Sequence, residues 1–362
     1  MQPKKKILVI CPHPENRVPG QRLKYEQYFA HWRANGYEVT VAPFFNHRMQ
    51  DILYRKGYYA EKAMWVIMGY IKRFLLLFTL ARYDIVYTFL WVTPFGPPLF
   101  ERLATLINSR IVYDIDDAIF LKSKSLINQY ANWIKGRSKP FFMMRKAKQV
   151  IACTPYLTNV ALQYNKNVTD ISSTIDTIRY QPVNSYQNKE LLTLGWSGSH
   201  STSQYLQLLQ PVLAQLQQTH PFKLLVMGDP HFKMEDVNVE AIAWSDAAEI
   251  PTLQRFDIGL YPLPLADDWV LGKSGLKALQ YMAVGVPVVA TAIGANFRII
   301  THQQTGLLVQ TNEEWLNALI QLLEDATLRK KIGLAGRTNV EKFYSINANA
   351  EIYLAILLAA SK

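Results

Sequence analysis

The sequence predicts an α/β protein built from two doubly wound, Rossmann-like domains. Three observations predict this class: a length of 362 residues, the alternation of short β-branched runs with longer amphipathic stretches, and the restart of that alternation after a polar connector. A chain of this length exceeds one ordinary core and suits two domains of about 150 to 200 residues. With 49% hydrophobic and 19% charged residues, the composition is that of an ordered globular protein.

The first half shows the strand and helix patterns of β-α-β units. It begins with a strand at 6–11, a helix at 22–35 that ends at Gly36, and a strand at 37–43. Parallel strands joined by helices form a doubly wound sheet. The further elements expected in this half are a helix at 60–80, strands at 84–90, 110–115 and 149–153, and a helix at 156–164.

The polar connector at 181–190 lacks the apolar periodicity of its flanks, so we place the domain boundary there. The expected domains are residues 1–180, joined by a C-terminal helix at 346–362 that crosses back to them, and residues 181–345. Two such units face each other across a cleft that receives the carboxyl ends of their strands. The elements expected in the second half are strands at 191–196, 223–227, 257–261 and 286–291, and helices at 202–217, 274–284, 328–343 and 348–360.

Positive charge is concentrated in the first half of the chain. Residues 1–180 carry 26 Lys and Arg against 12 Asp and Glu, whereas residues 181–362 carry 13 against 16. A basic half favours a polyanionic partner, such as an anionic membrane surface or a phosphorylated acceptor, and a merely solvated surface is the alternative. Nucleic acid is not expected as a partner, because no binding motif accompanies the charge.

The compartment expected is the cytoplasm, with the protein peripheral at the inner face of the membrane. Cys11 and Cys153 each lie in an apolar run, which favours reduced thiols over a disulfide. Charges or prolines interrupt the apolar stretches at 63–81 and 85–100, so neither predicts a spanning helix. Aromatic and basic residues share the segment 61–80, a combination that suits a membrane interface, although a buried helix fits the pattern equally well.

The phosphate loops of dehydrogenases and of P-loop kinases are absent from the sequence, which argues against both classes. Instead, Gly-Trp-Ser-Gly-Ser-His-Ser-Thr occupies residues 195–202, between an expected strand and an expected helix. Gly198 permits close approach of a ligand to the backbone, and Ser199 offers a hydroxyl near a helix N-terminus. A glycine turn with a serine N-cap is the alternative.

A second phosphate-binding candidate lies at the start of the helix near residue 275. Ser274 is expected to cap that helix, so that the N–H groups of Gly275 and Leu276 hold a diphosphate. Lys273 and Lys277 are four residues apart and are expected to face one ligand. A diphosphate leaving group needs such positive charge, because charge accumulates on it as the bond breaks. Solvated surface lysines are the alternative.

The stretch from 257 to 291 resembles the donor-site signature of the retaining GT-B glycosyltransferases of family 4, group 1. In that family a Gly-Leu turn, a helix ending in Tyr-Met-Ala-x-Gly and a strand Pro-Val-Val-Ala follow in this order, as they do here. The resemblance includes 226–229 and is looser at 16–28 and 112–117. It implies a GT-B architecture, a nucleotide-sugar donor, and transfer with retention to a glycan or lipid-linked acceptor, as in bacterial surface polysaccharide or glycolipid synthesis. It also implies catalysis without a metal or other cofactor.

The resemblance also implies roles for individual residues. Lys273 and Lys277 take the catalytic positions beside the diphosphate, and Asp116 stands where family members often carry a His that touches the donor sugar. Three carboxylates at a strand end are poorly explained by packing, although capping of a following helix is the alternative. The acceptor-side residues are Arg22, Asp114 and Asp117. The donor-binding residues are Gly198, Ser199, His200, Gly228, Asp229, Ser274, Gly275, Leu276 and Gln280.

This chain departs from the family pattern at two helix positions and in the phosphate loop, where the family's Arg and Lys are missing near Ser199 and Lys273 and Lys277 are expected to replace them. The family helix usually presents two glutamates with seven residues between them, and here Gly272 and Gln280 replace them. Gln280 can still hydrogen-bond a ribose hydroxyl, whereas Gly272 has no side chain to offer the sugar. Two other functions therefore stay open: a nucleotide-sugar epimerase of the same architecture, and a catalytically silent protein that binds nucleotide sugars.

Overall fold

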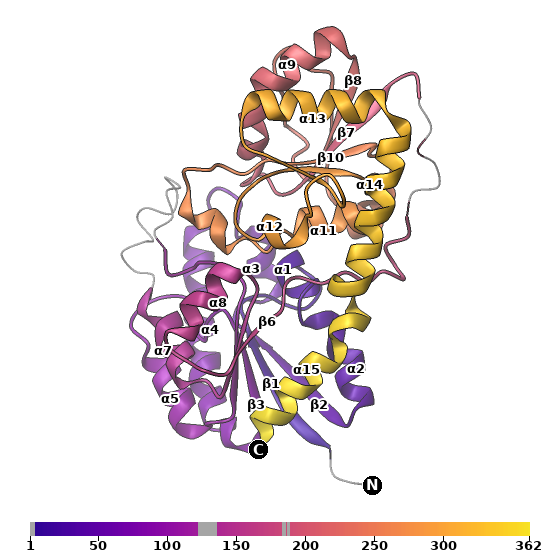
Figure 1. Ribbon diagram of the computed structural model, residues 1–362. Coiled ribbons are helices and arrows are strands. Elements are labelled where there is room, and N and C mark those ends of the chain that lie inside the picture. The colour runs from indigo at the N-terminus through magenta and orange to yellow at the C-terminus, as the bar shows by residue number, and fades with distance from the viewer. Residues whose placement is uncertain (1–3, 122–135, 183–185, 187–188) are drawn as a thin grey trace. The chain divides into compact units, whose positions relative to one another are not determined.

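The computed structural model describes residues 4–121, 136–182, 186 and 189–362 and divides into two compact units. Unit 1 comprises 1–173, 271–274 and 349–362, and unit 2 comprises 174–270 and 275–348. Each unit contains one six-stranded parallel sheet covered by helices (Figure 1). The predicted α/β class with two Rossmann-like domains is confirmed. Part of the predicted connector, at 183–185 and 187–188, lies outside the described residues.

The sheet of unit 1 has the strand order β2-β1-β3-β4-β5-β6. The chain passes from β1 to β2 on one side and then returns to β3 on the other side, which is the doubly wound topology. Cys11 ends β1 and Cys153 follows β5, and both are buried free thiols, as predicted. The strands are β1 Lys5–Cys11, β2 Tyr37–Pro43, β3 Ile85–Phe89, β4 Ile111–Ile115, β5 Gln149–Ala152 and β6 Val168–Asp170.

The helix predicted at 22–35 is wrong, because this segment is divided into three short pieces. These are α1 Pro19–Arg22, a 3-10 turn at Glu26–Tyr28, and α2 Phe29–Ala34. Lys24, between the first two pieces, is fully buried against Asp114 of β4, a contact that a continuous surface helix does not make. The other helices of unit 1 are α3 His47–Ile52, α4 Tyr59–Leu77, α5 Leu99–Ile107, α7 Ser138–Lys146 and α8 Pro155–Leu162, with a 3-10 turn at Leu80–Arg82.

The C-terminal helix α15, Ile346–Ser361, packs on unit 1 as predicted. Tyr353 is fully buried, and its ring centroid lies 4.4 Å from that of Tyr28 and 5.9 Å from that of Trp32. Aromatic pairs at these separations add to the stabilisation that comes from buried area alone. The last residues of the chain therefore complete the core of the first sheet.

The sheet of unit 2 has the strand order β12-β11-β10-β7-β8-β9. The helix predicted at 202–217 begins instead as a 3-10 helix at Ser203–Leu209 and becomes α9, Gln210–Thr219, with Pro211 in its first turn. Proline is tolerated there because its missing N–H would have no partner within the helix. The strands are β7 Leu192–Ser197, β8 Phe222–Met227, β9 Val239–Ile242, β10 Ile258–Tyr261, β11 Val288–Thr291 and β12 Leu307–Val309. The helices are α10 Asp246–Leu253, α11 Leu276–Ala283, α12 Asn296–Ile299, α13 Asn312–Glu324 and α14 Ala326–Asn339, followed by a π-helical turn at Val340–Tyr344.

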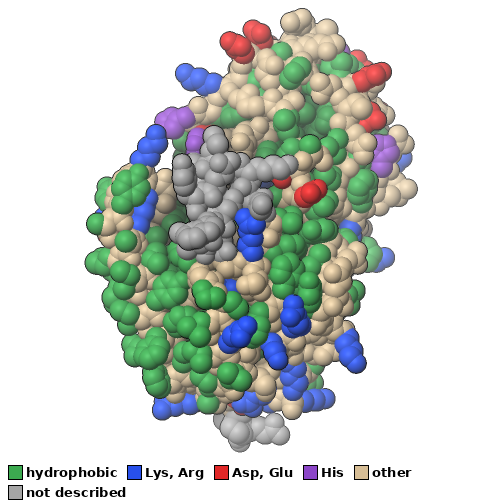
Figure 2. All heavy atoms as spheres, turned by 90° about the vertical axis from the view of Figure 1, so that its left-hand side faces the viewer, with side chains coloured by type: hydrophobic (Ala, Val, Ile, Leu, Met, Phe, Trp, Pro, Cys, Tyr) green, Lys and Arg blue, Asp and Glu red, His purple; other side chains and the backbone are tan. Residues whose placement is uncertain are grey.

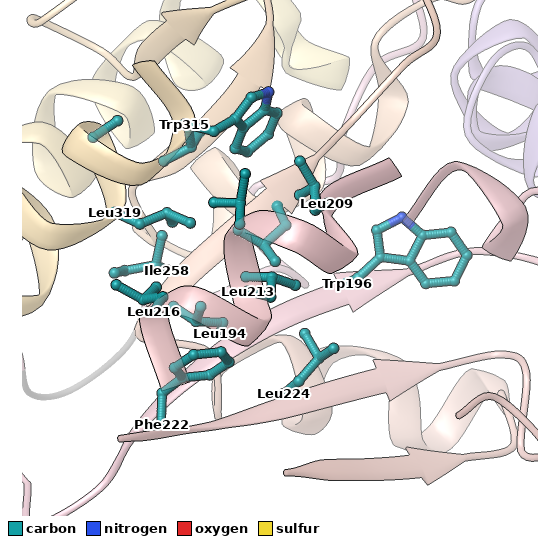
Figure 3. Close-up of a cluster of buried hydrophobic side chains, with 14 of the residues drawn as sticks. Leu194, Trp196, Leu209, Leu213, Leu216, Phe222, Leu224, Ile258, Trp315 and Leu319 are labelled. Atoms are coloured by element: carbon teal, nitrogen blue, oxygen red, sulfur yellow. The ribbon is translucent and has the colours of Figure 1, made fainter. Parts of the chain in front are cut away.

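A buried hydrophobic cluster fixes the central strands of unit 2. Figure 3 shows Leu194 of β7 and Leu224 of β8 beneath Leu213 of α9, with Leu319 of α13 on the same side of the sheet. Trp196 belongs to this cluster and is 1% exposed. Burial of large apolar side chains is the main favourable contribution to folding. Trp196, next to the carboxyl end of β7, is therefore held in place by the packing of this cluster.

Candidate functional site in unit 2 and an acidic cluster in unit 1

The strand order of unit 2 reverses between β7 and β10. From β7 the chain continues through β8 and β9 on one side and returns to β10 on the other. In open α/β sheets ligands bind at the carboxyl ends of strands where the order reverses. The loop after β7 begins at Gly198, and α11 follows β10. The first candidate site is therefore formed by these two segments.

Only glycine fits at position 198. A Cβ atom there would lie 2.5 Å from the Trp196 ring and 2.8 Å from Cε of Lys277. The Gly198 N–H donates to the carbonyl oxygen of Met227 at 2.9 Å, which joins the loop to the end of β8. Two of the predicted site residues are thus brought together, because the backbone of Gly198 lies beside the side chain of Lys277.

The loop after β8 touches the loop after β7. Gly228 has a φ of 105°, and a Cβ atom there would lie 1.8 Å from the carbonyl oxygen of Gly198. Next to it, Asp229 accepts a hydrogen bond from Ser203 at 2.6 Å and lies 3.2 Å from Nδ1 of the exposed His200. Burial acts to raise the pKa of Asp229, but these hydrogen bonds outweigh it and the net pKa is lowered.

Ser199 extends the same loop into solvent. Its hydroxyl lies 2.8 Å from that of Ser201 and 3.5 Å from that of Thr202. The predicted residues Ser199, His200, Gly228 and Asp229 therefore lie on two adjoining loops. They place hydroxyl, imidazole and carboxylate groups near the Gly198 backbone.

Helix α11 begins one residue later than predicted. Gly275 is its N-cap, with a left-handed φ of 76°, and Leu276 is its first residue. A Cβ atom at 275 would lie 2.2 Å from Ile299, so glycine is required by space as well as by conformation. The prediction that Ser274 caps this helix is wrong, because the Ser274 hydroxyl instead lies 2.9 Å from that of Ser173 within unit 1.

Lys277, in the first turn of α11, lies over two aromatic rings. Its Nζ is 5.3 Å from the ring centroid of Trp196 and 5.6 Å from that of Tyr261. A cation within about 6 Å of an aromatic face is attracted to it. The contacts leave the ammonium beside the Gly198 backbone, where an anion can reach the lysine and the helix N-terminus together.

Three aromatic residues of this site were not predicted: Trp196, Tyr261 and Tyr281. Tyr281 lies one turn after Lys277, and its hydroxyl accepts a hydrogen bond from the Ser197 N–H at 2.9 Å. Burial raises the pKa of Tyr281 to about 12, so the hydroxyl stays neutral. The signal that could have found two of them is their position in the chain. Trp196 lies two residues before Gly198, and Tyr281 lies four residues after Lys277.

Gln280 is held in a buried network of unit 2. Its amide nitrogen donates to Glu249 at 2.9 Å and to the Tyr180 hydroxyl at 3.2 Å, and the residue is 5% exposed. The hydroxyl of Tyr180 in turn donates to Glu249 at 3.0 Å. The amide nitrogen of Gln280 is therefore occupied by Glu249 of α10 and by Tyr180.

Unit 1 contains a second cluster, where buried Lys24 meets two of the predicted carboxylates. Its Nζ lies 2.9 Å from Oδ1 of Asp114 and 3.5 Å from Oδ1 of Asp116. The Tyr87 hydroxyl also donates to Asp114. Burial raises the pKa of Asp114, while Lys24 and Tyr87 oppose that change. Lys24 was missed because a lysine in an expected amphipathic helix predicts a solvated side chain.

Asp116 is the predicted sugar-contact residue. Burial raises its pKa to about 6, Lys24 opposes the rise, and the neighbouring Asp114 and Asp117 add to it. The start of α1 lies against this carboxylate, since a Cβ atom on Gly20 would be 3.2 Å from Oδ2 of Asp116. Arg22, the last residue of α1, is 8% exposed.

Asp117, the third predicted carboxylate, forms an ion pair with Lys273 at 3.1 Å within unit 1. Gly272 packs against the same turn, because a Cβ atom there would lie 2.5 Å from the Ala118 nitrogen. The glutamate usual in the related family therefore has no room at this position. Lys273 belongs to unit 1 and Lys277 to unit 2, so their joint action on one ligand stays a prediction.

The described residues contain neither a metal-binding cluster nor a membrane-spanning helix. Within residues 4–121, 136–182, 186 and 189–362, no group of three or more His, Cys, Asp and Glu is arranged to hold a metal ion. Over the same part of the chain, no helix has both the length and the hydropathy needed to cross a membrane.

The fold is that of the GT-B glycosyltransferases. A glycosyltransferase from Rickettsia africae superimposes with a TM-score of 0.70 over 100% of both chains, at 15% sequence identity. The Anabaena protein HepE, solved with UDP and glucose, gives a TM-score of 0.69 over 98% of this chain and 100% of its own, at 15% identity. Sucrose-phosphate synthase from Thermosynechococcus elongatus gives 0.67 over 98% and 100%, at 16% identity.

Residues 189–325 match the family of glycosyl transferases group 1. D-inositol 3-phosphate glycosyltransferase of Paenarthrobacter aurescens is 39% identical over 71 residues, which is 19% of this chain and 17% of that protein. The enzyme of the same name from Pseudarthrobacter chlorophenolicus is 34% identical over 98 residues, which is 26% and 20%. The match thus spans a fifth or less of these curated relatives.

Proposed function

We propose that this chain is a family 4 GT-B glycosyltransferase, which moves a sugar from a nucleoside diphosphate sugar to an acceptor with retention of configuration. The observation that carries the proposal is the meeting of Gly198, Lys277 and the N-terminus of α11 at the reversal of strand order in unit 2. All three features lie in the segment that matches the family. A helix N-terminus next to a lysine is suited to a diphosphate.

In the proposed reaction, the bond between the anomeric carbon and the diphosphate oxygen breaks as the acceptor hydroxyl attacks the same face. The departing diphosphate takes the acceptor proton, so the reaction needs no protein nucleophile. Negative charge grows on the diphosphate, and Lys277 with the N–H groups at the start of α11 stabilises it. Lys273 is the second proposed cation. It would leave its ion pair with Asp117 and bind the diphosphate instead.

The proposed donor contacts continue on the neighbouring loops. Ser199, His200, Gly228 and Asp229 surround the nucleotide, and the amide oxygen of Gln280 accepts from a ribose hydroxyl. The HepE structure contains UDP and glucose, which supports a nucleotide-sugar donor here. We further propose that catalysis needs no metal, because lysines and a helix dipole supply the positive charge.

The proposed acceptor contacts lie in unit 1. Asp116 accepts hydrogen bonds from sugar hydroxyls of the donor or acceptor, and Arg22 and Asp117 complete that side. Asp114 is fully buried, so the acceptor contact predicted for it is replaced by a positioning role, in which it holds Lys24 next to Asp116. The basic first half suits a phosphorylated or lipid-linked acceptor at the inner face of the membrane, as in bacterial surface polysaccharide or glycolipid synthesis. The curated relatives are named for a phosphorylated acceptor, D-inositol 3-phosphate, which supports this class.

A product assay separates the proposal from its alternatives. The protein is incubated with UDP-, GDP- and ADP-sugars, with and without candidate acceptors, and the nucleotides and sugars are resolved by chromatography. Free nucleoside diphosphate together with a glycosylated product supports the transferase. An altered sugar nucleotide would identify an epimerase instead, and binding without turnover would identify a silent binding protein. Nuclear magnetic resonance of the product's anomeric proton tests retention.

A further inference from the structure

Helix α4 of unit 1 turns apolar side chains toward solvent. Ile67, Phe74 and Phe78 are 59%, 53% and 70% exposed, and the exposed apolar residues recur every three or four positions. That interval places side chains on one face of a helix. The stripe extends for about 21 Å along the helix axis. It consists of Met64, Ile67, Ile71, Phe74, Leu75 and Phe78.

The opposite face of α4 is anchored by a buried arginine. Arg73 is 2% exposed and donates to three carbonyl oxygens: Val92 at 2.8 Å, Ala42 at 2.9 Å and Cys11 at 3.0 Å. Burial lowers the pKa of Arg73 to about 10, so the guanidinium remains charged near neutral pH. Turning the apolar stripe inward would strip this cation of its acceptors, which is costly for a buried charge. The outward orientation of the stripe is therefore fixed by the fold.

The neighbouring helix α5 enlarges the apolar surface. Leu99 and Leu106 are 56% and 82% exposed, and the Asn108 side chain that ends α5 donates to the carbonyl oxygens of Leu80 and Tyr83, just after α4. Figure 2 views the side on which α4, α5 and α7 lie in Figure 1. It shows hydrophobic side chains gathered over a broad area of unit 1, with Lys and Arg side chains at its lower border.

The charge around this surface is positive. Residues 54–110 contain eight Lys and Arg but three Asp and Glu. Of the acidic residues, Glu101 is fully buried and Glu61 forms an ion pair with Arg48. Lys72 and Arg82 are exposed on and just after α4. An apolar stripe bordered by cations is complementary to a layer of acyl chains beneath anionic headgroups.

We propose that α4 and the exposed residues of α5 form a membrane-binding surface for an anionic phospholipid bilayer. The helix lies in the interface, with Ile67, Ile71 and Phe74 at the acyl boundary and Lys72 and Arg82 near lipid phosphates. A second copy of the chain fits less well, because its identical basic border would face this one. Membrane binding by this surface does not require transferase activity.

Sedimentation with vesicles tests the surface. The full chain is mixed with vesicles of phosphatidylcholine alone or with about one-third phosphatidylglycerol. We expect binding to the anionic vesicles that weakens with added salt. Combining Ile67→Ser, Ile71→Ser and Phe74→Ser should lower the vesicle partition coefficient about tenfold or more, because burial of apolar side chains drives interfacial binding. Lys72→Glu with Arg82→Glu should remove the preference for anionic lipid.

Three apolar residues of unit 2 with comparable exposure provide a matched control variant. Leu208→Ser, Leu334→Ser and Phe343→Ser change side chains that are 48%, 43% and 53% exposed and should leave vesicle binding unchanged. Circular dichroism melting verifies that both triple variants are folded. No binding of the wild type, or equal binding of both triple variants, overturns the proposal. A concentration-dependent dimer that only the α4 variant abolishes would also overturn it, because the surface would then join two copies. Thermal shifts with sugar nucleotides test donor binding separately.

Discussion

Units 1 and 2 are both doubly wound, with different strand orders, and they also differ in how their functional groups are assembled. In unit 2, Gly198 and Lys277 each lie in a short recognisable motif, and these two motifs meet at the reversal of strand order. In unit 1, Lys24 reaches Asp114 from 90 positions away in the chain, and Arg73 of α4 reaches Cys11 of β1. Recognisable motifs thus mark the functional groups of unit 2, whereas Lys24 and Arg73 of unit 1 lie in no such motif.

The largest expected effect concerns the cation of unit 2. Lys277→Ala should lower kcat/KM for sugar transfer by about 10²–10³, which is about 3 to 4 kcal/mol of transition-state stabilisation. Lys277→Arg should retain part of the activity because it keeps the charge over the aromatic rings. Steady-state kinetics measures both, with exposed Lys331→Ala as the control. Wild-type kinetics in Lys277→Ala would remove this residue from the mechanism.

A pair of glycines compares the loops of the two units directly. Gly228 and Gly36 both have positive φ, but only Gly228 has a neighbouring atom within reach of a Cβ. Gly228→Ala should lower the free energy of unfolding by about 3 kcal/mol, from overlap with the Gly198 carbonyl and backbone strain. Gly36→Ala should cost about 1 kcal/mol, from strain alone. Urea unfolding measures both, and equal losses would contradict the close contact between the two loops.

The buried carboxylate of unit 1 predicts a pH dependence of stability. The pKa of Asp116 is raised from 3.8 to about 6, so between these values the folded state holds a proton that the unfolded state has lost. Stability from this group therefore falls as the pH rises through that window. Asp116→Asn should remove this pH dependence, so that between pH 4 and pH 7 the variant gains about 2 kcal/mol in free energy of unfolding relative to the wild type. The gain is smaller than the full pKa shift corresponds to, because the side chain is 15% exposed and water screens its charge.

Chemical denaturation at several pH values measures this difference, and exposed Glu38→Gln provides the control. An unchanged pH profile in Asp116→Asn would show that the carboxylate is ionised in the folded protein over the whole window. In that case Lys24, rather than burial, would govern the cluster.

The smallest expected effect is that of chelation. If lysines and the α11 N-terminus supply the positive charge, EDTA should change the transfer rate by less than about twofold. Activity is measured before and after dialysis against EDTA, and then with added Mg²⁺ or Mn²⁺. A loss that either ion restores would contradict the proposed metal-independent mechanism.

The accuracy of the sequence predictions follows the same difference between the two units. Gly198 and Lys277 were predicted because each lies in a short motif, a glycine turn after a strand and the first turn of a helix, that can be recognised from a few neighbouring residues. The break in the predicted helix at Lys24 and the burial of Arg73 on α4 could not be predicted, since each depends on hydrogen-bond or ion-pair acceptors from distant parts of the chain. Ser274 was assigned wrongly because serine is a common N-cap, whereas the left-handed Gly275 takes that place. The pattern at 61–80 left an interfacial and a buried helix equally plausible, and α4 has one buried and one exposed face.

A structure determined with a bound nucleoside diphosphate tests the central claim most directly. Thermal-shift screening of UDP-, GDP- and ADP-sugars selects the nucleotide, since ligand binding stabilises the folded state. We expect diphosphate oxygens within about 3 Å of Lys277 Nζ and of the first N–H groups of α11. A diphosphate bound elsewhere, with Lys277 still over the Trp196 ring and its ammonium not contacting the ligand, would rule out the proposed donor site.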